Sequence, residues 1–311
     1  MRIAILGASS QIAKDLIQSF AIFTDHQLTL FGRNIENINE WQINNQFSRS
    51  FEVLGYEQLH LRNDFNAIIN FVGIGDPAKA KAMGDSILTL TRYYDRLAVD
   101  YVEHHPYCQY IFLSSGAVFG SNYDNPVDQN SVLMTASEKF QHQDWYGLAK
   151  AEAEKFHRSL DHLNILDVRV FNYFSRTQDM SARFLITDIV RAIRDRSVLN
   201  TNGHNLMRDF LHPYDFYQLM SKALEFQEIN SAIDCYTKAP IDKFTLLNEM
   251  GQRYNLRFEI SKAEAGILAT GSKINYYSKN YAAKKIRYEP LYSSLDGVSV
   301  EIAGYLDGIS H

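Results

Sequence analysis

The fold class is decided by the stretch Arg2-Ile3-Ala4-Ile5-Leu6-Gly7-Ala8-Ser9-Ser10-Gln11-Ile12-Ala13. Residues 3–6 are apolar without alternation, which is typical of a strand that is buried on both faces of a sheet. Gly7 marks a turn, and from residue 11 to 20 the apolar side chains recur at the spacing of one helix face. The chain therefore begins with a strand, a glycine turn and a helix.

The same alternation continues along the first half of the chain. Further apolar runs predict strands at 28–31, 67–72 and 110–113, with a shorter candidate at 51–54. Helical periodicity predicts helices over about 80–103 and 146–160. Strands that alternate with helices indicate a parallel sheet covered on both faces, so we predict an α/β protein with a Rossmann-type doubly wound parallel sheet.

The alternation of predicted strands and helices ends after about residue 170, where strand signals become sparse and Tyr, Asn and Lys become frequent. We therefore predict two domains. Residues 1–170 would form the sheet domain, with segments around 205–240 returning to it, and residues 171–311 a smaller and less regular domain.

Composition excludes several classes of protein. The 311 residues carry a net charge of -5 with acidic and basic residues mixed, which argues against a nucleic-acid partner. The two cysteines, Cys108 and Cys235, form no disulfide framework, which favours a reducing compartment. The chain shows no signal peptide and no run of about 18 apolar residues. We expect a cytoplasmic protein with no membrane partner.

The glycine turn lies where a dinucleotide would bind, because ligands of such sheets occupy the carboxyl ends of the strands. Gly7 takes the place of the first small residue of a dinucleotide-binding turn, Ser10 the second and Ala13 the third. An ordinary strand-turn-helix would look the same from this turn alone. Arg33 follows the second strand where NAD enzymes carry an acid, and this favours NADP over NAD. A solvated surface arginine is the alternative.

The expected cofactor contacts come from several strand ends. We predict that NADP, or NAD, contacts Gly7, Ser9, Ser10, Gln11, Ile12, Arg33, Phe71, Val72, Gly73, Tyr146 and Lys150.

Tyr146 and Lys150 are four positions apart at the start of a predicted helix, so they share one face. A free tyrosine has a pKa of about 10, which a neighbouring ammonium lowers toward the range useful for proton transfer. Ser115 ends a predicted strand, where its hydroxyl could bind a substrate oxygen together with Tyr146. Taken singly, Tyr146 is also explained as a packed tyrosine, Lys150 as an exposed lysine and Ser115 as a capping serine. The order of glycine turn, strand-end serine and Tyr-x-x-x-Lys predicts a catalytic site.

The motifs together resemble the extended short-chain dehydrogenase/reductase family of sugar-nucleotide epimerases, reductases and dehydratases. Residues 112–120 are similar to the family strand that bears the catalytic Ser or Thr, which falls on Ser115, and Tyr146 and Lys150 match the catalytic pair. Residues 169–172 resemble the entry to the substrate domain, which implies that Asn172 touches substrate. Residues 207–215 are similar to the family's RDFxHVxD stretch, which implies that Arg208 holds the substrate diphosphate.

The resemblance implies a smaller C-terminal substrate-binding domain and hydride transfer at a sugar carbon of a nucleotide-diphosphate sugar. Gly116 and Ala117 stand where the dehydratases carry Asp and Glu, so a ketoreductase or an epimerase is expected and not a 4,6-dehydratase. The second diphosphate arginine of many members has no clear counterpart; Lys262, Lys273 or Arg287 could replace it. The alternative is a non-catalytic NADP-binding sensor of the same fold. No metal site is expected, and the two long helices make a homodimer possible.

Overall fold

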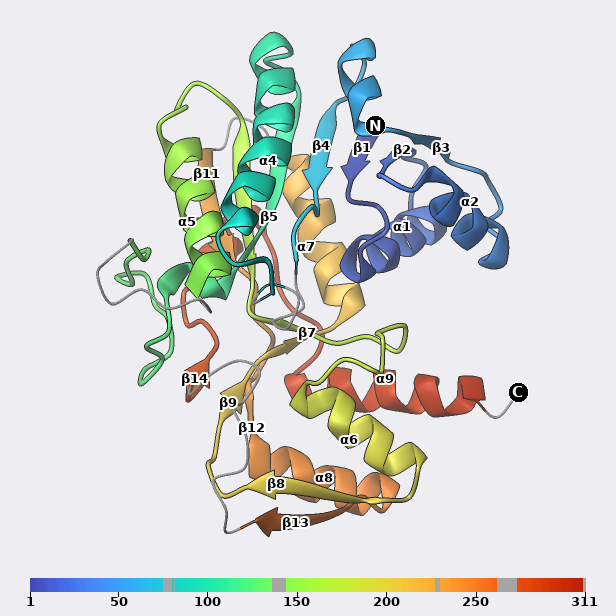
Figure 1. Ribbon diagram of the computed structural model, residues 1–311, viewed down its shortest axis with the longest axis vertical. Helices are drawn as coiled ribbons and strands as arrows, with labels where there is room; N and C mark the ends of the chain where they lie inside the picture. The colour runs from blue at the N-terminus through green and yellow to red at the C-terminus, as the bar shows by residue number, and fades with distance from the viewer. Residues whose placement is uncertain (75–79, 81, 136–143, 227–229, 262–272, 310–311) are drawn as a thin grey trace.

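The computed structural model describes residues 1–74, 80, 82–135, 144–226, 230–261 and 273–309. Seven parallel strands form the central sheet in the order β11-β6-β5-β4-β1-β2-β3 (Figure 1). Their bounds are β1 Arg2–Leu6, β2 Gln27–Phe31, β3 Glu52–Leu54, β4 Ala67–Asn70, β5 Gln109–Ser115, β6 Ile165–Val170 and β11 Asn230–Asp234. The order reverses between β1 and β4, and such a switch point opens a crevice for ligands at the carboxyl edge of the sheet.

Helices cover both faces of this sheet, as the apolar strands require. The helices are α1 Gln11–Phe23, α2 Ile35–Asn44, α4 Ser86–His104, α5 Trp145–Arg158 and α7 Pro213–Glu225. Within β1, Ile3 and Ile5 pack into a core with α1, α2 and α7, whereas Ala4 and Leu6 pack into a core with α4 and α5. Successive strand residues point to opposite faces, so each strand must be apolar along its whole length.

A second group of elements has a core of its own, which includes Phe174, Leu247 and Ile302. It contains helices α6 Leu185–Arg194, α8 Lys243–Tyr254 and α9 Ser294–Ile309. Its strands are β7 Asn172–Tyr173, β8 Val198–Asn202, β9 Met207–Arg208, β10 Phe210–Leu211, β12 Ile241–Asp242, β13 Arg257–Ser261 and β14 Asn275–Tyr276. Short 3₁₀ turns are η1 Tyr56–Leu61, η2 Gly116–Phe119 and η4 Ala282–Ile286.

The doubly wound parallel sheet confirms the predicted fold class. The expectation of sparse strands beyond residue 170 was wrong, because strands are frequent there but many are only two residues long, too short for a periodic signal. We propose the same division of the chain near residue 170. Two observations support the return of later segments to the first unit: β11 pairs with β6, and Phe216 and Leu219 of α7 pack into the core of α1.

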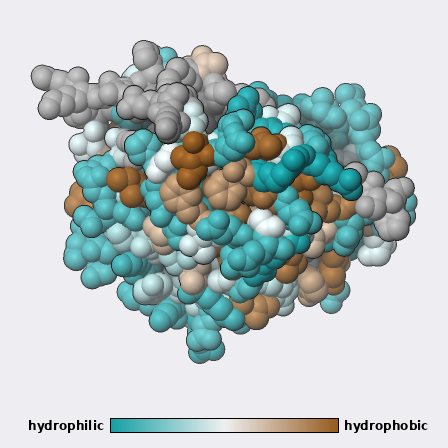
Figure 2. All heavy atoms as spheres, turned by 90° about the horizontal axis from the view of Figure 1, so that it is seen from below, coloured by the Kyte–Doolittle hydropathy of each residue, from teal (hydrophilic) through white to brown (hydrophobic). Residues whose placement is uncertain are grey.

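The surface mixes polar and apolar groups. In Figure 2, which views the molecule from below Figure 1, hydrophilic groups predominate and apolar groups occur in small patches. Exposed apolar side chains of the paired strands β8 and β13 include Val198 and Ile260. No helix among the described residues has the length and apolar composition needed to cross a membrane.

Candidate active site

The glycine turn after β1 requires glycine for two reasons. Gly7 has φ +75°, which side-chain-bearing residues rarely adopt, and a Cβ there would lie 2.9 Å from the backbone of Phe71 and of Val72. The turn is thereby packed directly against the end of β4. Gly7, Phe71 and Val72, all predicted from the sequence to contact the cofactor, thus meet at the switch point.

Ser10 begins α1 as its N-cap, and its Oγ accepts a hydrogen bond of 3.4 Å from the Ala13 backbone N–H. This explains the departure from glycine, since a capping serine satisfies an N–H that the first turn leaves unpaired. Ser9 is exposed and Gln11 half-buried, and the Gln11 amide donates to Asp15 Oδ1 at 3.2 Å. The predicted cofactor residues Ser9 to Ile12 therefore surround the N-terminus of α1, an end that favours anions.

Arg33 is exposed, one residue past Gly32 at the end of β2. Burial raises the pKa of Tyr56, which lies in η1, to about 12. A hydrogen bond from the Gly7 backbone and the charge of Arg33 act against that rise. The Tyr56 ring packs 4.5 Å, centroid to centroid, from that of Tyr94 on α4. This tyrosine pair beside the glycine turn was not predicted, because nothing in the spacing of Tyr56 and Tyr94 indicates contact.

Ser115 is the last residue of β5 and is buried. Its Oγ accepts from the Ala117 backbone N–H at 3.2 Å and lies 3.4 Å from the Tyr276 hydroxyl. A further hydrogen bond joins Ser115 to Tyr146. The fold therefore brings the predicted serine and tyrosine together and adds a third hydroxyl, that of Tyr276.

Lys150 lies one helical turn after Tyr146 on α5 and is buried. Its Nζ donates to the Leu113 carbonyl at 2.8 Å and to the Val72 carbonyl at 3.5 Å, and lies 4.1 Å from the centroid of the Phe112 ring. Burial lowers the pKa of Lys150 to about 8. The ammonium thus lies at the carboxyl ends of β4 and β5, close to Gly73, where an added Cβ would approach it to 3.4 Å.

The pKa of Tyr146 differs from the sequence expectation. Burial raises the pKa above its ordinary value, and the hydrogen bond with Ser115 lowers it in part. Burial is the larger of these two effects, and the Lys150 ammonium bonds the carbonyl of Leu113. That Lys150 lowers the pKa of Tyr146 during catalysis stays a prediction.

Two glycines allow α5 and β6 to approach Ser115. A Cβ on Gly147 would lie 2.4 Å from the Ala117 carbonyl oxygen, and one on Gly116 would lie 2.3 Å from the Phe171 ring. Gly147 follows Tyr146, so close packing of α5 against η2 carries the tyrosine toward Ser115. Neither glycine was recognised as a packing residue from the sequence.

Arg208 and Lys273 form a pair of cations on the far side of Tyr276. Arg208 Nη1 donates to the Lys273 carbonyl at 2.9 Å, and Lys273 Nζ lies 4.5 Å from the Tyr276 ring centroid. Burial lowers the pKa of Arg208 to about 10, and burial together with the Arg208 charge lowers the pKa of Lys273 to about 8. The negative charge of Asp144 acts against this fall at Lys273, and the two neighbouring cations make this end of the site attractive to an anion.

The other candidates for the second cation are placed elsewhere or not described. Arg287 ends η4, and this turn packs against β11, so Arg287 is not part of the cation pair. Lys262 lies outside the described residues. Of the two candidates among the described residues, Lys273 is the one that the fold brings to Arg208.

Asn172 begins β7, and its amide donates to the carbonyls of Tyr276 at 3.1 Å and Asp209 at 3.4 Å. These bonds tie β7 to the strands that carry Arg208 and Tyr276. The side chain is half-buried, and its oxygen has no hydrogen bond from the described residues, so it could still accept one from a ligand. Tyr276 itself, which connects both halves of the site, was missed because its position depends on strand β14 rather than on any motif.

The fold and this crevice define a dinucleotide-binding protein of the Rossmann class. The chain belongs to the NAD dependent epimerase/dehydratase family, whose model matches residues 3–234. This family belongs to the extended short-chain dehydrogenases/reductases and consists of enzymes that act on sugar nucleotides, which confirms the predicted resemblance. A search of curated proteins found no match.

Solved structures similar to this chain carry several activities. A UDP-glucose-4-epimerase from Stenotrophomonas maltophila, with bound NAD, has a TM-score of 0.81 at 14% identity, covering 100% of this chain and 99% of that chain. A UDP-glucuronic acid 4-epimerase from Bacillus cereus, in complex with UDP-glucuronic acid and NAD, has a TM-score of 0.79 at 16% identity, covering 99% and 100%. A dTDP-glucose 4,6-dehydratase from Bacillus anthracis, in complex with NAD, has a TM-score of 0.76 at 14% identity, covering 100% and 98%. At these identities the likeness establishes the fold.

Proposed function

We propose that the protein is a nicotinamide-dependent enzyme that transfers a hydride at a sugar carbon of a nucleotide-diphosphate sugar, as a ketoreductase or an epimerase. The observation that carries this proposal is that a pair of hydroxyls, a buried ammonium and a pair of cations meet at the carboxyl edge of the sheet. The Ser115 and Tyr146 hydroxyls are hydrogen-bonded beside the buried Lys150, and the cations of Arg208 and Lys273 lie beyond Tyr276.

The residues of the crevice fit a dinucleotide. The Gly7 turn has room for no side chain on the side facing β4, and the N-terminus of α1 offers backbone donors to a pyrophosphate. When bound, the nicotinamide would accept or supply the hydride. Lys150, which faces Gly73 and the Val72 carbonyl, would hold the nicotinamide ribose.

The protein's own part is proton transfer and orientation. Tyr146 would remove or return the proton of the reacting hydroxyl, and Ser115 would hold the same oxygen in place. General acid–base catalysis of this kind contributes about 100-fold or more to a rate. For this, the pKa of Tyr146 must fall from its raised value, and a positive charge next to the phenol would have that effect.

Elimination of water is disfavoured by the packing around η2. A carboxylate at position 116 has no room, since even a Cβ there would overlap the Phe171 ring at 2.3 Å. Ala117 supplies no acid or base either. This supports a ketoreductase or an epimerase over a dehydratase, although a dehydratase is among the solved structures of the same fold.

The cofactor is proposed to be NADP, with NAD as the alternative. The supporting observation is the exposed Arg33 after β2, at the place where a 2′-phosphate would lie. The similar solved structures contain NAD. Calorimetric titration with NADPH and NADH decides between them: we expect NADPH to bind more tightly, and Arg33→Ala to remove that preference. Equal affinities in both proteins would contradict the NADP proposal.

Turnover is tested with NADPH and a 4-keto sugar nucleotide, and separately with NAD and a panel of UDP- and dTDP-sugars followed by NMR of the anomeric proton. NADPH oxidation identifies a ketoreductase, and formation of a second sugar nucleotide without net oxidation identifies an epimerase. Tyr146→Phe should lose about 100-fold or more in turnover while keeping cofactor affinity. Cofactor binding without turnover on any substrate would favour the non-catalytic sensor.

A further inference from the structure

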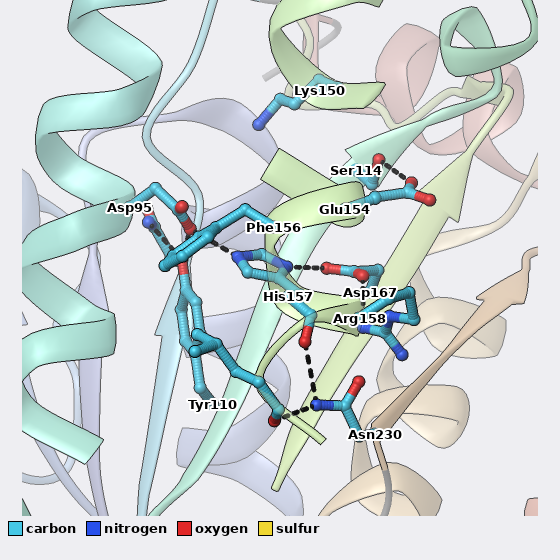
Figure 3. A network of polar contacts seen from close by, with 12 residues as sticks. Asp95, Tyr110, Ser114, Lys150, Glu154, Phe156, His157, Arg158, Asp167 and Asn230 are labelled. Carbon is cyan, nitrogen blue, oxygen red and sulfur yellow. Dashed lines mark hydrogen bonds and ion pairs between the residues drawn. The ribbon is translucent and has the colours of Figure 1, made fainter. Parts of the chain in front are cut away.

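A histidine with two carboxylate partners is buried behind the proposed site. The His157 side chain is completely buried; its Nε2 lies 2.8 Å from Asp95 Oδ1 and its Nδ1 lies 2.6 Å from Asp167 Oδ1 (Figure 3). Neutral imidazole has one N–H, and ionised carboxylates only accept, so two such bonds to ionised carboxylates require both ring nitrogens to be protonated. His157 is therefore an imidazolium. Burial opposes this charge, but Asp167 and Asp95 raise the pKa of His157 to about 10.

The elements packed around His157 contribute further charges. Arg158 Nη2 donates to Asp167 Oδ2 at 2.6 Å, and the Tyr110 hydroxyl donates to Asp95 Oδ1 at 2.8 Å. Three residues before His157 on α5, Glu154 accepts from the Ser114 hydroxyl at 2.5 Å and from Arg169 Nη2 at 2.5 Å. Arg169 Nη1 also reaches Asp234 Oδ1 at 3.1 Å, and Asp234 Oδ2 accepts from the Ser278 hydroxyl at 2.6 Å.

The formal charges of this buried network do not cancel by themselves. Its carboxylates are those of Asp95, Asp167, Glu154 and Asp234, and its cations are those of His157, Arg158 and Arg169. One negative charge is left over among these described residues. The ammonium of Lys150, on the same helix α5, is a buried positive charge that can balance it.

Lys150 is linked to His157 through the ring of Phe112. Its Nζ lies 4.1 Å from the centroid of the Phe112 ring, and the His157 ring contacts the same ring edge-on at a centroid distance of 5.2 Å. Figure 3 shows the Lys150 side chain running from α5 toward the side on which Asp95 lies. Burial lowers the pKa of Lys150 to about 8, and the negative charges of Asp95, Asp167 and Glu154 act against that fall.

We propose that the carboxylates of Asp95 and Asp167, which bond the two ring nitrogens of His157, are the counter-charge that keeps Lys150 protonated in the interior. They are positioning residues, since they act on the site through Lys150. The consequence for catalysis rests on the proposed function: a neutral Lys150 would be a weaker partner for a ribose hydroxyl and would give no electrostatic support to the phenolate of Tyr146.

The experiment measures the charge of Lys150 by NMR and needs no substrate or cofactor. Protein with ¹³Cε-labelled lysine is titrated from pH 6 to 11, and the Lys150 signal is assigned with Lys150→Met. Asp95→Asn keeps an oxygen that accepts from His157 and Tyr110 but removes the charge. We expect the Lys150 midpoint to fall, so that the ratio of amine to ammonium at pH 8 rises about tenfold. The control is Asp100→Asn: Asp100 lies on α4 as Asp95 does but is exposed, so this substitution should not move the midpoint.

A purely structural network predicts a different result. In that case Asp95→Asn would lower the melting temperature and leave the Lys150 midpoint unchanged, which would overturn the proposal. If Asp95→Asn does not fold, ¹⁵N spectra of histidine in the unaltered protein provide the test, since both ring nitrogens of His157 should stay protonated at pH 8. A neutral His157 there would equally overturn the proposal. Neither readout depends on turnover, so failure of the proposed function leaves both tests intact.

Discussion

The hydroxyl oxygens of Ser115 and Tyr276 lie 3.4 Å apart, although 161 positions separate the two residues along the chain. Ser115 ends a strand of the large sheet, and Tyr276 belongs to the three-stranded sheet β12-β9-β14. The Tyr276 ring also contacts Tyr123, with centroids 4.8 Å apart, and Lys273. One side chain therefore joins the proposed chemical end of the crevice to its cationic end.

Substitutions of Tyr276 should separate these two contacts. Tyr276→Phe removes the hydroxyl beside Ser115 and keeps the ring, so we expect KM for the sugar nucleotide to rise about three- to tenfold, the value of one hydrogen bond, with little change in kcat. Tyr276→Ala also removes the ring beside the cations and should weaken UDP binding, measured by calorimetry. Unchanged KM in both variants would show that Tyr276 does not face the substrate.

Diphosphate binding should depend on the charge of Lys273. Because the pKa of Lys273 is lowered to about 8, its charge is lost as pH rises through that value, and the attraction for a diphosphate weakens above it. We expect UDP affinity to fall between pH 7 and 9, and Lys273→Met to bind about tenfold more weakly at pH 7 with little pH dependence. Arg287→Met, at the end of η4, is the matched control and should bind as the unaltered protein does. An equal loss in both variants would count against the cation pair.

The contact of Gly147 with η2 predicts opposite effects of the same substitution at two helical glycines. Gly147→Ala would place a Cβ 2.4 Å from the Ala117 carbonyl oxygen, so we expect a loss of about 1–3 kcal/mol in unfolding free energy and a lower kcat. Gly251→Ala in α8 would meet nothing closer than 3.4 Å, so helix propensity should dominate and stabilise by up to about 1 kcal/mol. Urea unfolding measures both. Stabilisation by Gly147→Ala would contradict the packing of α5 described here.

The contacts of Glu301, on α9, predict that the folded protein loses part of its stability at acidic pH. The Glu301 carboxylate is buried and accepts from the backbone N–H of Arg176 at 2.7 Å, from Arg176 Nη2 at 2.9 Å and from His212 Nε2 at 3.2 Å. Burial opposes its charge, but the bonds from His212 and Arg176 lower the pKa of Glu301 from 4.5 to about 2. The folded-state pKa lies below the unfolded value, so this stabilisation is present above pH 4.5 and is lost as pH falls toward 2.

Glu301→Gln should therefore destabilise the protein most at neutral pH. We expect a difference of about 3 kcal/mol at pH 6 that narrows as pH falls below 4.5, measured by urea unfolding at several pH values. Glu259→Gln, an exposed carboxylate of β13, should show little difference at any of them. A gap that is the same at pH 6 and pH 3 would mean that Glu301 acts through packing and not through its charge.

The amino-acid sequence by itself determined the sheet and one wall of the site. Uninterrupted apolar runs and helical periodicity are local signals, and in a parallel sheet they place Gly7, Gly32, Gly73 and Ser115 at one edge whatever the rest of the chain does. The spacing of Tyr146 and Lys150 likewise puts them on one helix face.

Tertiary structure decided what no local pattern contains. Two-residue strands such as β9 and β14 have no period of their own, so the meeting of Arg208, Lys273 and Tyr276 depends on how they pair. The direction of the Lys150 ammonium follows from a carbonyl on another strand, and the raised pKa of Tyr146 follows from burial. In the sequence, nothing distinguishes His157 from an ordinary helical residue. Only in the fold do α4 and β6 bring Asp95 and Asp167 to its two nitrogens. Charges and hydroxyls act through space, and distances through space are set by the fold.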